Sequence, residues 1–391
     1  MTNRPWDTLS KEEIKQLQEN FLDWYDEKKR HLPWRMNTDP YRVWISEIML
    51  QQTRVDTVID YYYRFMEEFP TIHALATADE EKLLKVWEGL GYYSRARNLQ
   101  AAAKQMVADF AGKMPDTVEE IASLKGIGPY TTGAIASISF GLPEPAIDGN
   151  VMRVVSRLFE IEADIAKASS RKIFDEAMRK IIPKVAPGDF NQALMDLGSS
   201  VCTPKKPECP VCPLKDFCLA YKDDKMTDFP VKTKKQPPKP VYYVAAAIEN
   251  SQGEFWLVQR PENGLLAKMW TFPLLEIDEK HYQQLKSGFN KEESLQMELL
   301  VAEEDKAEQV LPFEEAHVIW QKRHLGEVTH LFSHLKWHLL LFYGRMIGGE
   351  APEKMPEQWV AKDEFSKLVF PKLQQKLVEQ LDKNRRDNKV F

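Results

Sequence analysis

All four cysteines of this 391-residue chain lie in one short segment. Cys202, Cys209, Cys212 and Cys218 have the spacing C-x6-C-x2-C-x5-C. Four thiolates can hold either a tetrahedral zinc ion or a [4Fe–4S] cluster, and the residue types alone leave both open. A disulfide-stabilised secreted protein would spread its cysteines along the chain, so this grouping indicates a metal centre in a cytosolic protein.

Two carboxyl side chains stand in surroundings that suit acid–base chemistry. Asp148, in the segment AIDGNV, stands where a helix is expected to begin. It could be a simple N-cap, but helix N–H groups would also keep it ionised, and a fixed anion can stabilise a sugar cation. Glu47 lies in the mostly apolar segment WISEIMLQQT. Burial there would raise its pKa, whereas a glutamate on a wet helix face is the equally weighted alternative.

The segment LKGIGPYT, residues 124–131, predicts two helices joined by a tight hairpin. Gly126 and Gly128 allow a sharp turn and the close approach of another molecule. The N–H groups that begin the second helix, up to Thr131, could bind a phosphate with the positive end of the helix dipole. An ordinary helix–helix turn is the alternative, but the capping box predicted at residues 117–120 favours a hairpin that binds DNA.

Apolar periodicity predicts a helical region before residue 225, with no segment typical of a strand. The expected helices cover 8–29, 41–68, 79–88, 95–110, 117–124, 130–140, 149–159, 170–182 and 190–201.

A change of composition marks the end of this helical region. The segment DFPVKTKKQPPKP, residues 228–240, is rich in proline and lysine and predicts a semi-rigid linker. Strand-like runs then flank a Ser-Gln-Gly turn in YYVAAAIENSQGEFWLVQR. The segment HLFSHLKWHLLLFYGRMI predicts one or two more strands, and residues 362–383 predict a helix. The region after the linker is therefore expected to be α+β.

Bulk charge argues mildly against nucleic-acid binding, because the net charge is −6 and the pI about 5.9. A local basic patch would suffice, so a DNA-binding interpretation must rest on motifs. No run of 18 apolar residues and no apolar signal-peptide core occur in the sequence, and we expect a cytoplasmic protein.

The hairpin and the cysteine spacing resemble those of the endonuclease III and MutY superfamily, which implies a [4Fe–4S] cluster. Lyases of that superfamily carry a lysine on the second hairpin helix, where this chain has Tyr130. Without that amine no Schiff base can form, so the resemblance points to the monofunctional, adenine-removing branch. The segments WxSExMLQQTRV and PAIDGNVMRV also resemble the active-site segments of MutY-type adenine glycosylases.

That resemblance implies roles for individual residues. Glu47 would protonate adenine N7, and Asp148 would stabilise or covalently trap the sugar cation, assisted by Tyr130 and Asn150. The adenine, rotated out of the duplex, would enter a pocket formed by Arg30, Trp34, Arg35, Leu50 and Gln192. The wedge that fills the gap in the duplex would comprise Gln52, Thr53 and Tyr92. The DNA backbone would be held by Gly126, Gly128 and Thr131.

The region after residue 240 resembles the MutT-like C-terminal domain of adenine glycosylases, notably in LLAKMWTFP. We find no Arg-Glu-x-x-Glu-Glu run between residues 264 and 308, so diphosphate hydrolysis is not expected. The resemblance implies recognition of 8-oxoguanine by Phe332, Ser333 and His334, with Ser333 in direct contact. A metal site formed by His330, His334 and His338 is a minor alternative.

The sequence thus predicts a multidomain protein with an all-α helix-hairpin-helix glycosylase core, an iron–sulfur loop and an α+β Nudix-like domain. We expect a monomer that excises adenine opposite 8-oxoguanine or guanine in duplex DNA. An endonuclease III-like lyase for oxidised pyrimidines and a non-catalytic iron–sulfur DNA-binding protein are the alternatives. The expected divisions are 1–30 with 141–227 (cluster subdomain), 31–140 (hairpin subdomain), 228–240 (linker), 241–370 (Nudix-like domain) and 371–391 (C-terminal helix or tail).

Overall fold

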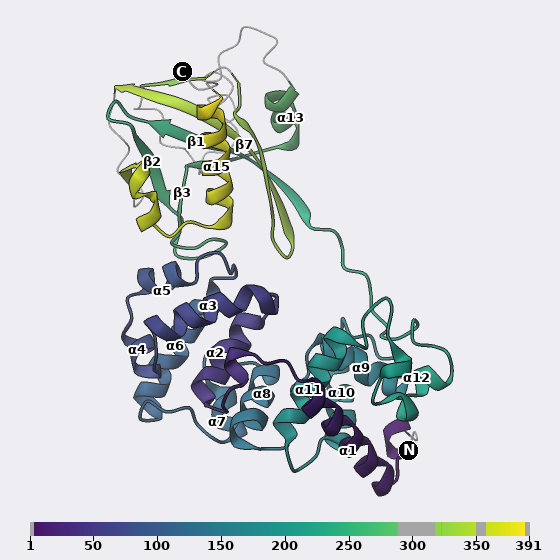
Figure 1. Cartoon of the computed structure of the whole chain (residues 1–391). Helices are drawn as coiled ribbons and strands as arrows, with labels where there is room; N and C mark the ends of the chain where they lie inside the picture. The colour runs from purple at the N-terminus through teal and green to yellow at the C-terminus, as the bar shows by residue number, and fades with distance from the viewer. Residues whose placement is uncertain (1–3, 288–316, 322, 349–356, 388–391) are drawn as a thin grey trace. The chain divides into compact units, whose positions relative to one another are not determined.

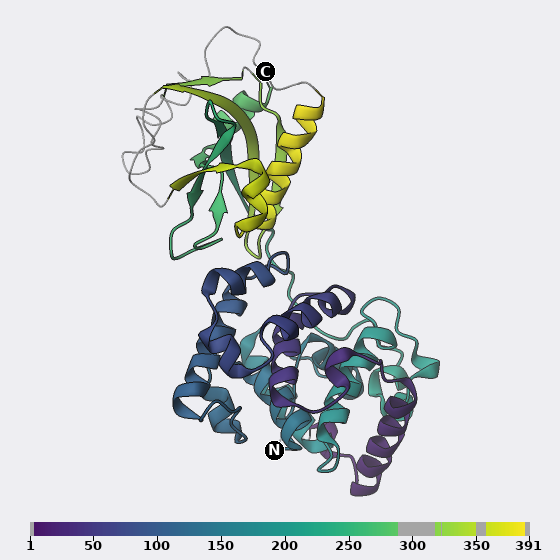
Figure 2. The same ribbon diagram turned by 60° about the vertical axis from the view of Figure 1, so that its left-hand side comes forward.

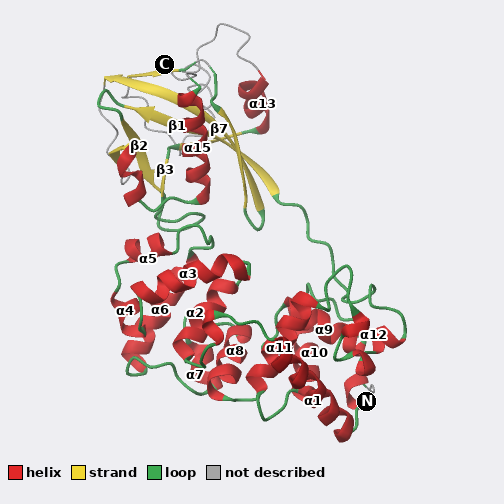
Figure 3. Cartoon of the chain, in the orientation of Figure 1, coloured by secondary structure: helices red, strands yellow, loops and turns green. Residues whose placement is uncertain are grey.

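The computed structural model describes residues 4–287, 317–321, 323–348 and 357–387 (Figure 1). The chain divides into two compact units, residues 1–86 with 94–235 and residues 87–93 with 236–391. Within the described residues the first unit is helical and every strand belongs to the second (Figure 3). This confirms the expected helical core followed by an α+β domain. No described helix combines the length and apolar character needed to cross a bilayer.

The first unit is built from α-helices joined by short loops and 3-10 turns. Its α-helices are α1 (Lys11–Lys28), α2 (Pro40–Leu50), α3 (Val55–Glu68), α4 (Ile72–Thr77), α5 (Glu80–Val86), α6 (Ser94–Asp109), α7 (Val118–Ser123), α8 (Pro129–Phe140), α9 (Gly149–Phe159), α10 (Arg171–Ile181), α11 (Pro187–Ser200) and α12 (Leu219–Lys222). Its 3-10 turns are η1 (Pro5–Asp7), η2 (Pro33–Arg35), η3 (Ala168–Ser170), η4 (Cys209–Val211) and η5 (Lys215–Phe217). The sequence analysis does not predict α4 and α12.

The single long helix expected over residues 41–68 is wrong, since α2 and α3 are separate helices. The buried guanidinium of Arg95 donates hydrogen bonds of 2.7 Å to the backbone oxygens of Ile48 and Gln51. These bonds satisfy carbonyls that would otherwise be unpaired where α2 ends. Gln52 then takes a left-handed backbone conformation, with φ +60°, and turns the chain towards α3.

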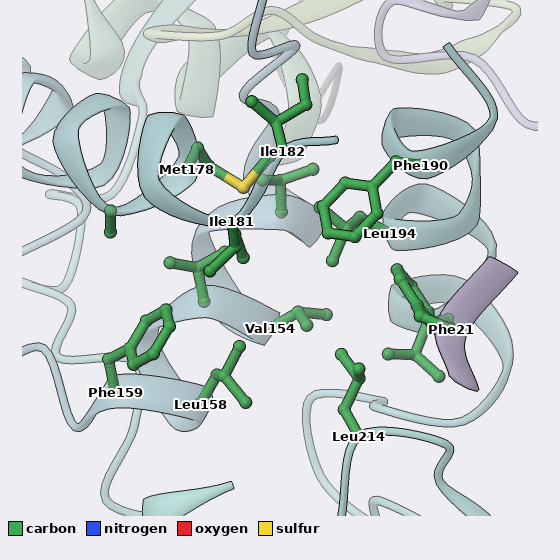
Figure 4. Close-up of a cluster of buried hydrophobic side chains, with 14 of the residues drawn as sticks. Phe21, Val154, Leu158, Phe159, Met178, Ile181, Ile182, Phe190, Leu194 and Leu214 are labelled. Carbon is green, nitrogen blue, oxygen red and sulfur yellow. The ribbon is translucent and has the colours of Figure 1, made fainter. Parts of the chain in front are cut away.

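A large apolar cluster joins α1 to α9, α10 and α11 (Figure 4). Phe21 of α1 packs edge to face against Phe190 of α11, with ring centroids 5.3 Å apart. Val154 and Leu158, one helical turn apart on α9, fill the space beside them. Leu214, from the cysteine loop, reaches the same cluster, so this core anchors both the helix that begins at Asp148 and the metal-binding loop.

The second unit contains an eight-stranded sheet whose central pair, β1 and β7, is parallel. The strands are β1 (Lys239–Glu249), β2 (Glu254–Gln259), β3 (Trp270–Thr271), β4 (Leu274–Ile277), β5 (His317–Trp320), β6 (Gly326–Leu331), β7 (Leu335–Gly348) and β8 (Glu357–Ala361). One path through the sheet runs β3-β2-β1-β7-β5, with β4, β6 and β8 paired to β1, β7 and β2. The turn between β1 and β2, and the separation of β6 from β7, agree with the sequence pattern.

Helices complete this unit. They are α13 (Glu279–Ser287), the 3-10 turn η6 (Lys362–Lys367) and α15 (Lys372–Arg386). Figure 2 shows α15, in yellow, beside the sheet. Leu373, Leu377 and Leu381 lie on one face of α15 and are fully buried in the same apolar cluster as residues of β1 and β7. The continuous helix expected over residues 362–383 is therefore wrong. Pro371, which precedes the first turn of α15, has an extended backbone and separates it from η6.

Candidate active site and iron–sulfur centre

Glu47 is a buried carboxyl in the middle of α2, with only 6% of its surface exposed. Burial raises its pKa to about 7, against the opposing effects of a hydrogen bond from Tyr130 and of the positive charge of Arg35. The negative charge of Asp148 raises the pKa further. Glu47 can therefore hold or release a proton near neutral pH.

Asp148 caps the N-terminus of α9, as the sequence predicts. Its Oδ1 accepts a 2.7 Å hydrogen bond from the backbone N–H of Val151, and its Oδ2 accepts one of 2.9 Å from the Asn150 amide. Burial nevertheless raises the pKa of Asp148 above its ordinary value, and these two bonds offset only part of the increase. The sequence predicts that the helix N–H groups keep Asp148 ionised; these hydrogen bonds do favour the anion, but desolvation opposes them.

Both carboxyls line one cavity of about 620 Å³ in the first unit. The structure brings to it nine further residues expected at the active site: Arg30, Trp34, Arg35, Leu50, Gln52, Thr53, Tyr130, Asn150 and Gln192. The cavity is also lined by residues without a predicted role: Leu32, Gln51, Arg54, Val55, Gly149, Met195 and Ser199. These residues come from η2, α2, α3, α8, α9, α11 and the loops beside them, so the cavity forms only when the first unit folds.

Tyr130 contacts a different carboxyl from the one expected. Its hydroxyl donates a 2.5 Å hydrogen bond to Oε2 of Glu47, whereas Asp148 receives its bond from Asn150. Asn150 is itself held by Arg153, which donates a 2.9 Å hydrogen bond to its amide oxygen. The expected assistance to Asp148 is therefore supported for Asn150, while Tyr130 acts on Glu47.

Asp196 is a buried residue of this site that has no predicted role. It accepts hydrogen bonds from Arg30 at 3.0 Å and from Arg35 at 2.7 Å. Burial tends to raise the pKa of Asp196, but the two guanidinium groups outweigh that effect and lower it. A signal was present in the sequence, because Asp196 lies four residues after Gln192 on the same helix face.

The hairpin has the geometry that its glycines predict. Gly126 has φ +77°, and a Cβ added there would lie 2.6 Å from Cβ of Asn98, so glycine is needed for two reasons. Gly128 precedes α8, whose first turn receives no side-chain cap. Thr131, however, is only 2% exposed and receives a long bond of 3.4 Å from Gln51. The side chain of Thr131 is therefore buried, and the phosphate contact expected at this position, from the backbone N–H groups, stays a prediction.

The helix before the hairpin is capped less completely than predicted. Thr117 caps α7 by accepting a 3.3 Å hydrogen bond from the backbone N–H of Glu120. The Glu120 carboxylate accepts a 2.7 Å hydrogen bond from the Thr117 hydroxyl, instead of one from the Thr117 backbone N–H that a capping box requires.

Gln52 and Tyr92, both expected to enter the duplex, have left-handed backbone conformations with φ +60° and +48°. Such conformations are unfavourable for side chains with a Cβ and occur often at functional sites. Tyr92 is 47% exposed.

In the second unit, Phe332, Ser333 and His334 form the turn between β6 and β7. Phe332 packs against Trp337, with ring centroids 4.8 Å apart, while Ser333 and His334 are exposed. The turn thus has an apolar anchor and a polar tip.

The histidine metal site receives no support from the residues that the structure describes, among which no three candidate ligands converge on a metal ion. His338 lies 3.3 Å from a Glu327 carboxylate oxygen, and His330 packs against Phe332. Part of the stretch searched for a diphosphate-hydrolase motif, residues 288–308, lies outside the described residues.

The thiols of Cys202, Cys209, Cys212 and Cys218 line one small apolar cavity. Four thiols around one cavity suit a cluster that binds one thiolate to each of its iron atoms. The buried Arg157 donates a 3.2 Å hydrogen bond to Sγ of Cys202, which would stabilise a thiolate there.

Comparison with protein families agrees with this geometry. Residues 45–183 match the HhH-GPD superfamily of base excision DNA repair proteins. Residues 202–218 match the iron-sulfur binding domain of endonuclease III, and residues 244–380 match a NUDIX domain. The fold and the site thus define a DNA glycosylase of the helix-hairpin-helix class, and a [4Fe–4S] cluster is the cofactor of its cysteine loop.

Similar proteins narrow the class. The adenine DNA glycosylase of Rattus norvegicus is 34% identical over 96% of this chain and 79% of its own length. That of Homo sapiens is 34% identical over 90% of this chain and 71% of its own length. The chain belongs to the adenine DNA glycosylase family of base excision repair enzymes. Among solved structures, a thermostable thymine-DNA glycosylase is 26% identical, covers 54% of this chain and 97% of its own, and has a TM-score of 0.48.

Proposed function

We propose that this enzyme hydrolyses the N-glycosidic bond of adenine paired with 8-oxoguanine or guanine, after the adenine has rotated out of the duplex. The observation that carries the proposal is that Glu47 and Asp148 line one cavity, in which burial raises the pKa of Glu47 to about 7. One carboxyl can then donate a proton while the other carries negative charge, the division of labour that glycosidic cleavage requires.

Glu47 is the general acid. Its proton passes to N7 of adenine as the bond between C1′ and N9 breaks, and the bonding electrons leave with the base. Tyr130 holds Oε2 of Glu47, which leaves the other carboxyl oxygen to carry the proton. Because the pKa is about 7, a substantial fraction of the enzyme is protonated at neutral pH.

Asp148 faces the positive charge that develops on the sugar. Ionised, it stabilises the oxocarbenium ion or forms a covalent bond to C1′, and water then supplies the hydroxyl group that completes hydrolysis. The bonds from Asn150 and from the N-terminus of α9 fix its position and favour its anionic form.

The remaining residues of the cavity recognise the base. Gln192 offers an amide to the ring edge of adenine, and Trp34 and Leu50 offer apolar surface. Arg30 and Arg35, held by Asp196, provide positive charge that favours an electron-rich base. Gln52 and Tyr92 occupy the space left in the duplex, and Gly126 and Gly128 hold its backbone.

The second unit recognises the damaged strand. The exposed Ser333 at the β6–β7 turn supports a direct hydrogen bond to 8-oxoguanine, with His334 beside it. The enzyme acts as a monomer on duplex DNA. The cysteine loop, whose basic residues Lys205, Lys206 and Lys215 lie between the ligands, positions the backbone.

A lyase for oxidised pyrimidines is the competing activity. It needs an amine that can form a Schiff base with the sugar. The described residues that line the cavity include arginines but no lysine, which favours hydrolysis.

The test is adenine release from a duplex with one adenine opposite 8-oxoguanine, beside a thymine glycol duplex. Hydrolysis predicts alkali-dependent strand breakage in the first duplex only, and an Asp148→Asn variant that binds DNA but is inactive. Alkali-independent cleavage of thymine glycol DNA, with a borohydride-trapped adduct, would establish the lyase instead.

A further inference from the structure

A second cavity, of about 370 Å³, adjoins the base pocket. Its walls come from the end of α1, the loop before α2, and α11, with Tyr63 of α3 and Ile138 of α8. Five residues line both cavities: Arg30, Leu32, Trp34, Arg35 and Gln192. Four of the five residues expected to contact the adenine, all except Leu50, thus also form the partition between the two cavities.

The two cavities reach solvent at different places. Met36 and Tyr63, which line the second cavity, are 84% and 57% exposed. The base pocket is bordered by the exposed Gln52 and Arg54, in the loop expected to meet the duplex. A molecule could therefore leave the second cavity without passing the side from which the flipped nucleotide enters.

The partition has fixed and adaptable members. Trp34 is buried and packs edge to face against Tyr62, with ring centroids 5.5 Å apart. The side chain of Arg30, in contrast, is 41% exposed, and one carboxylate, that of Asp196, holds it. The amide of Gln192 makes no hydrogen bond to any residue in the described part of the chain. Arg30 and Gln192 are therefore the partition residues whose rotamers can change without displacing the buried Trp34.

We propose that the second cavity binds the freed adenine and is its route out, so that the base leaves while the abasic duplex stays bound. This inference rests on the proposed function. Hydrolysis leaves a neutral purine in the base pocket. The DNA that delivered the base still covers the opening through which the flipped nucleotide entered that pocket. The exposed Asp189 carboxylate at the second cavity can accept a hydrogen bond from the exocyclic amine of the base.

Two variants would narrow this route outside the base pocket: Thr38→Trp and Met36→Trp. Both positions are exposed and line only the second cavity, so folding should tolerate them. Val185→Trp is the matched control, because it adds the same side chain at an exposed position, 81% accessible, that lines neither cavity.

The experiment uses excess full-length enzyme and a duplex that carries radiolabelled adenine opposite 8-oxoguanine. Alkali-treated samples report bond cleavage, and a filter that retains the protein–DNA complex separates free adenine. We expect the wild type and Val185→Trp to release adenine as fast as they cleave. We expect Thr38→Trp or Met36→Trp to cleave within about twofold of the wild-type rate but to release adenine at least about fivefold more slowly.

Equal release from all four proteins would overturn the exit route and leave the proposed function intact. If the wild type releases adenine only as fast as the abasic duplex dissociates, the exit route is also overturned. Absence of cleavage by the wild type would instead refute the proposed function, and the exit route with it.

Discussion

The Tyr130 hydroxyl donates a 2.5 Å hydrogen bond to Oε2 of Glu47, across 83 residues of sequence. This bond joins the first turn of α8, which follows the glycine hairpin, to the middle of α2. The helix whose N-terminus is proposed to bind the DNA backbone therefore also orients the proposed acid. A shift of the hairpin would move the hydrogen-bond donor of Glu47, which links DNA binding to the protonation of the base.

Tyr130→Phe should shift the pH profile of excision. The hydrogen bond from Tyr130 lowers the pKa of Glu47, in opposition to burial, so its loss should raise that pKa above about 7. A general acid works in its protonated form, and the basic limb of the single-turnover rate should therefore move to higher pH. Tyr61→Phe, on α3 beneath Arg64, is the control and should leave the profile unchanged. A basic limb that stays in place, or moves to lower pH, would contradict this role.

Glu47→Gln should abolish excision and change the pH dependence of stability. Folded Glu47 keeps its proton up to about pH 7, whereas an unfolded glutamate loses it near the ordinary pKa of 4.5. The folded state therefore binds more protons between these values, and the free energy of unfolding falls as pH rises through that window. Above pH 7, the free energy of unfolding should be about 3 kcal/mol lower than it is below the ordinary pKa of glutamate.

Urea denaturation of wild type and Glu47→Gln at pH 5 and pH 8 would measure this pH dependence of the free energy of unfolding. The variant should gain stability relative to the wild type at the higher pH. The same difference at both pH values would show that burial does not perturb this carboxyl.

Asp196→Asn should weaken catalysis more than DNA binding. The carboxylate holds both Arg30 and Arg35, and a neutral amide would leave two guanidinium groups close together without a balancing charge. We expect a loss of at least about tenfold in the single-turnover rate, with affinity for undamaged duplex within about twofold. Glu144→Gln is a suitable control, because Glu144 pairs with the exposed Arg179. Equal losses in both variants would argue against a specific role.

Gly126→Ala should weaken binding to any duplex. Its Cβ would lie 2.6 Å from Cβ of Asn98, in a backbone conformation with φ +77° that alanine adopts poorly. Gly141→Ala separates the steric clash from the backbone strain, since φ there is +68° but no atom lies within 4 Å of the added Cβ. We expect Gly141→Ala to lose about 1 kcal/mol of stability and Gly126→Ala to lose more, because Asn98 must also move, and only Gly126→Ala to lose affinity for undamaged DNA by at least about tenfold. Titration of a fluorescent duplex would measure the affinities, and unchanged binding by Gly126→Ala would remove the hairpin from the DNA interface.

Features that depend on neighbouring residues were predictable from the sequence. The cysteine spacing, the glycine hairpin and the helix start at Asp148 each depend on a few consecutive residues whose backbone preferences are local. The alternation of helical and strand-like segments likewise placed the boundary between the helical and α+β regions near the proline- and lysine-rich segment. The resemblance to a known family then supplied expected roles for side chains that these patterns could not assign.

Only the tertiary structure decided which side chains meet. Asp196 contacts two arginines more than 160 residues away, and the Tyr130 hydroxyl contacts Glu47, 83 residues away. Arg95 ends α2 from another helix, where periodicity predicts that the helix continues. The sequence by itself determined which local structures and which chemical groups were available. Folding determined their burial and partners, and hence their pKa values, because desolvation and hydrogen bonding depend on residues that are distant along the chain.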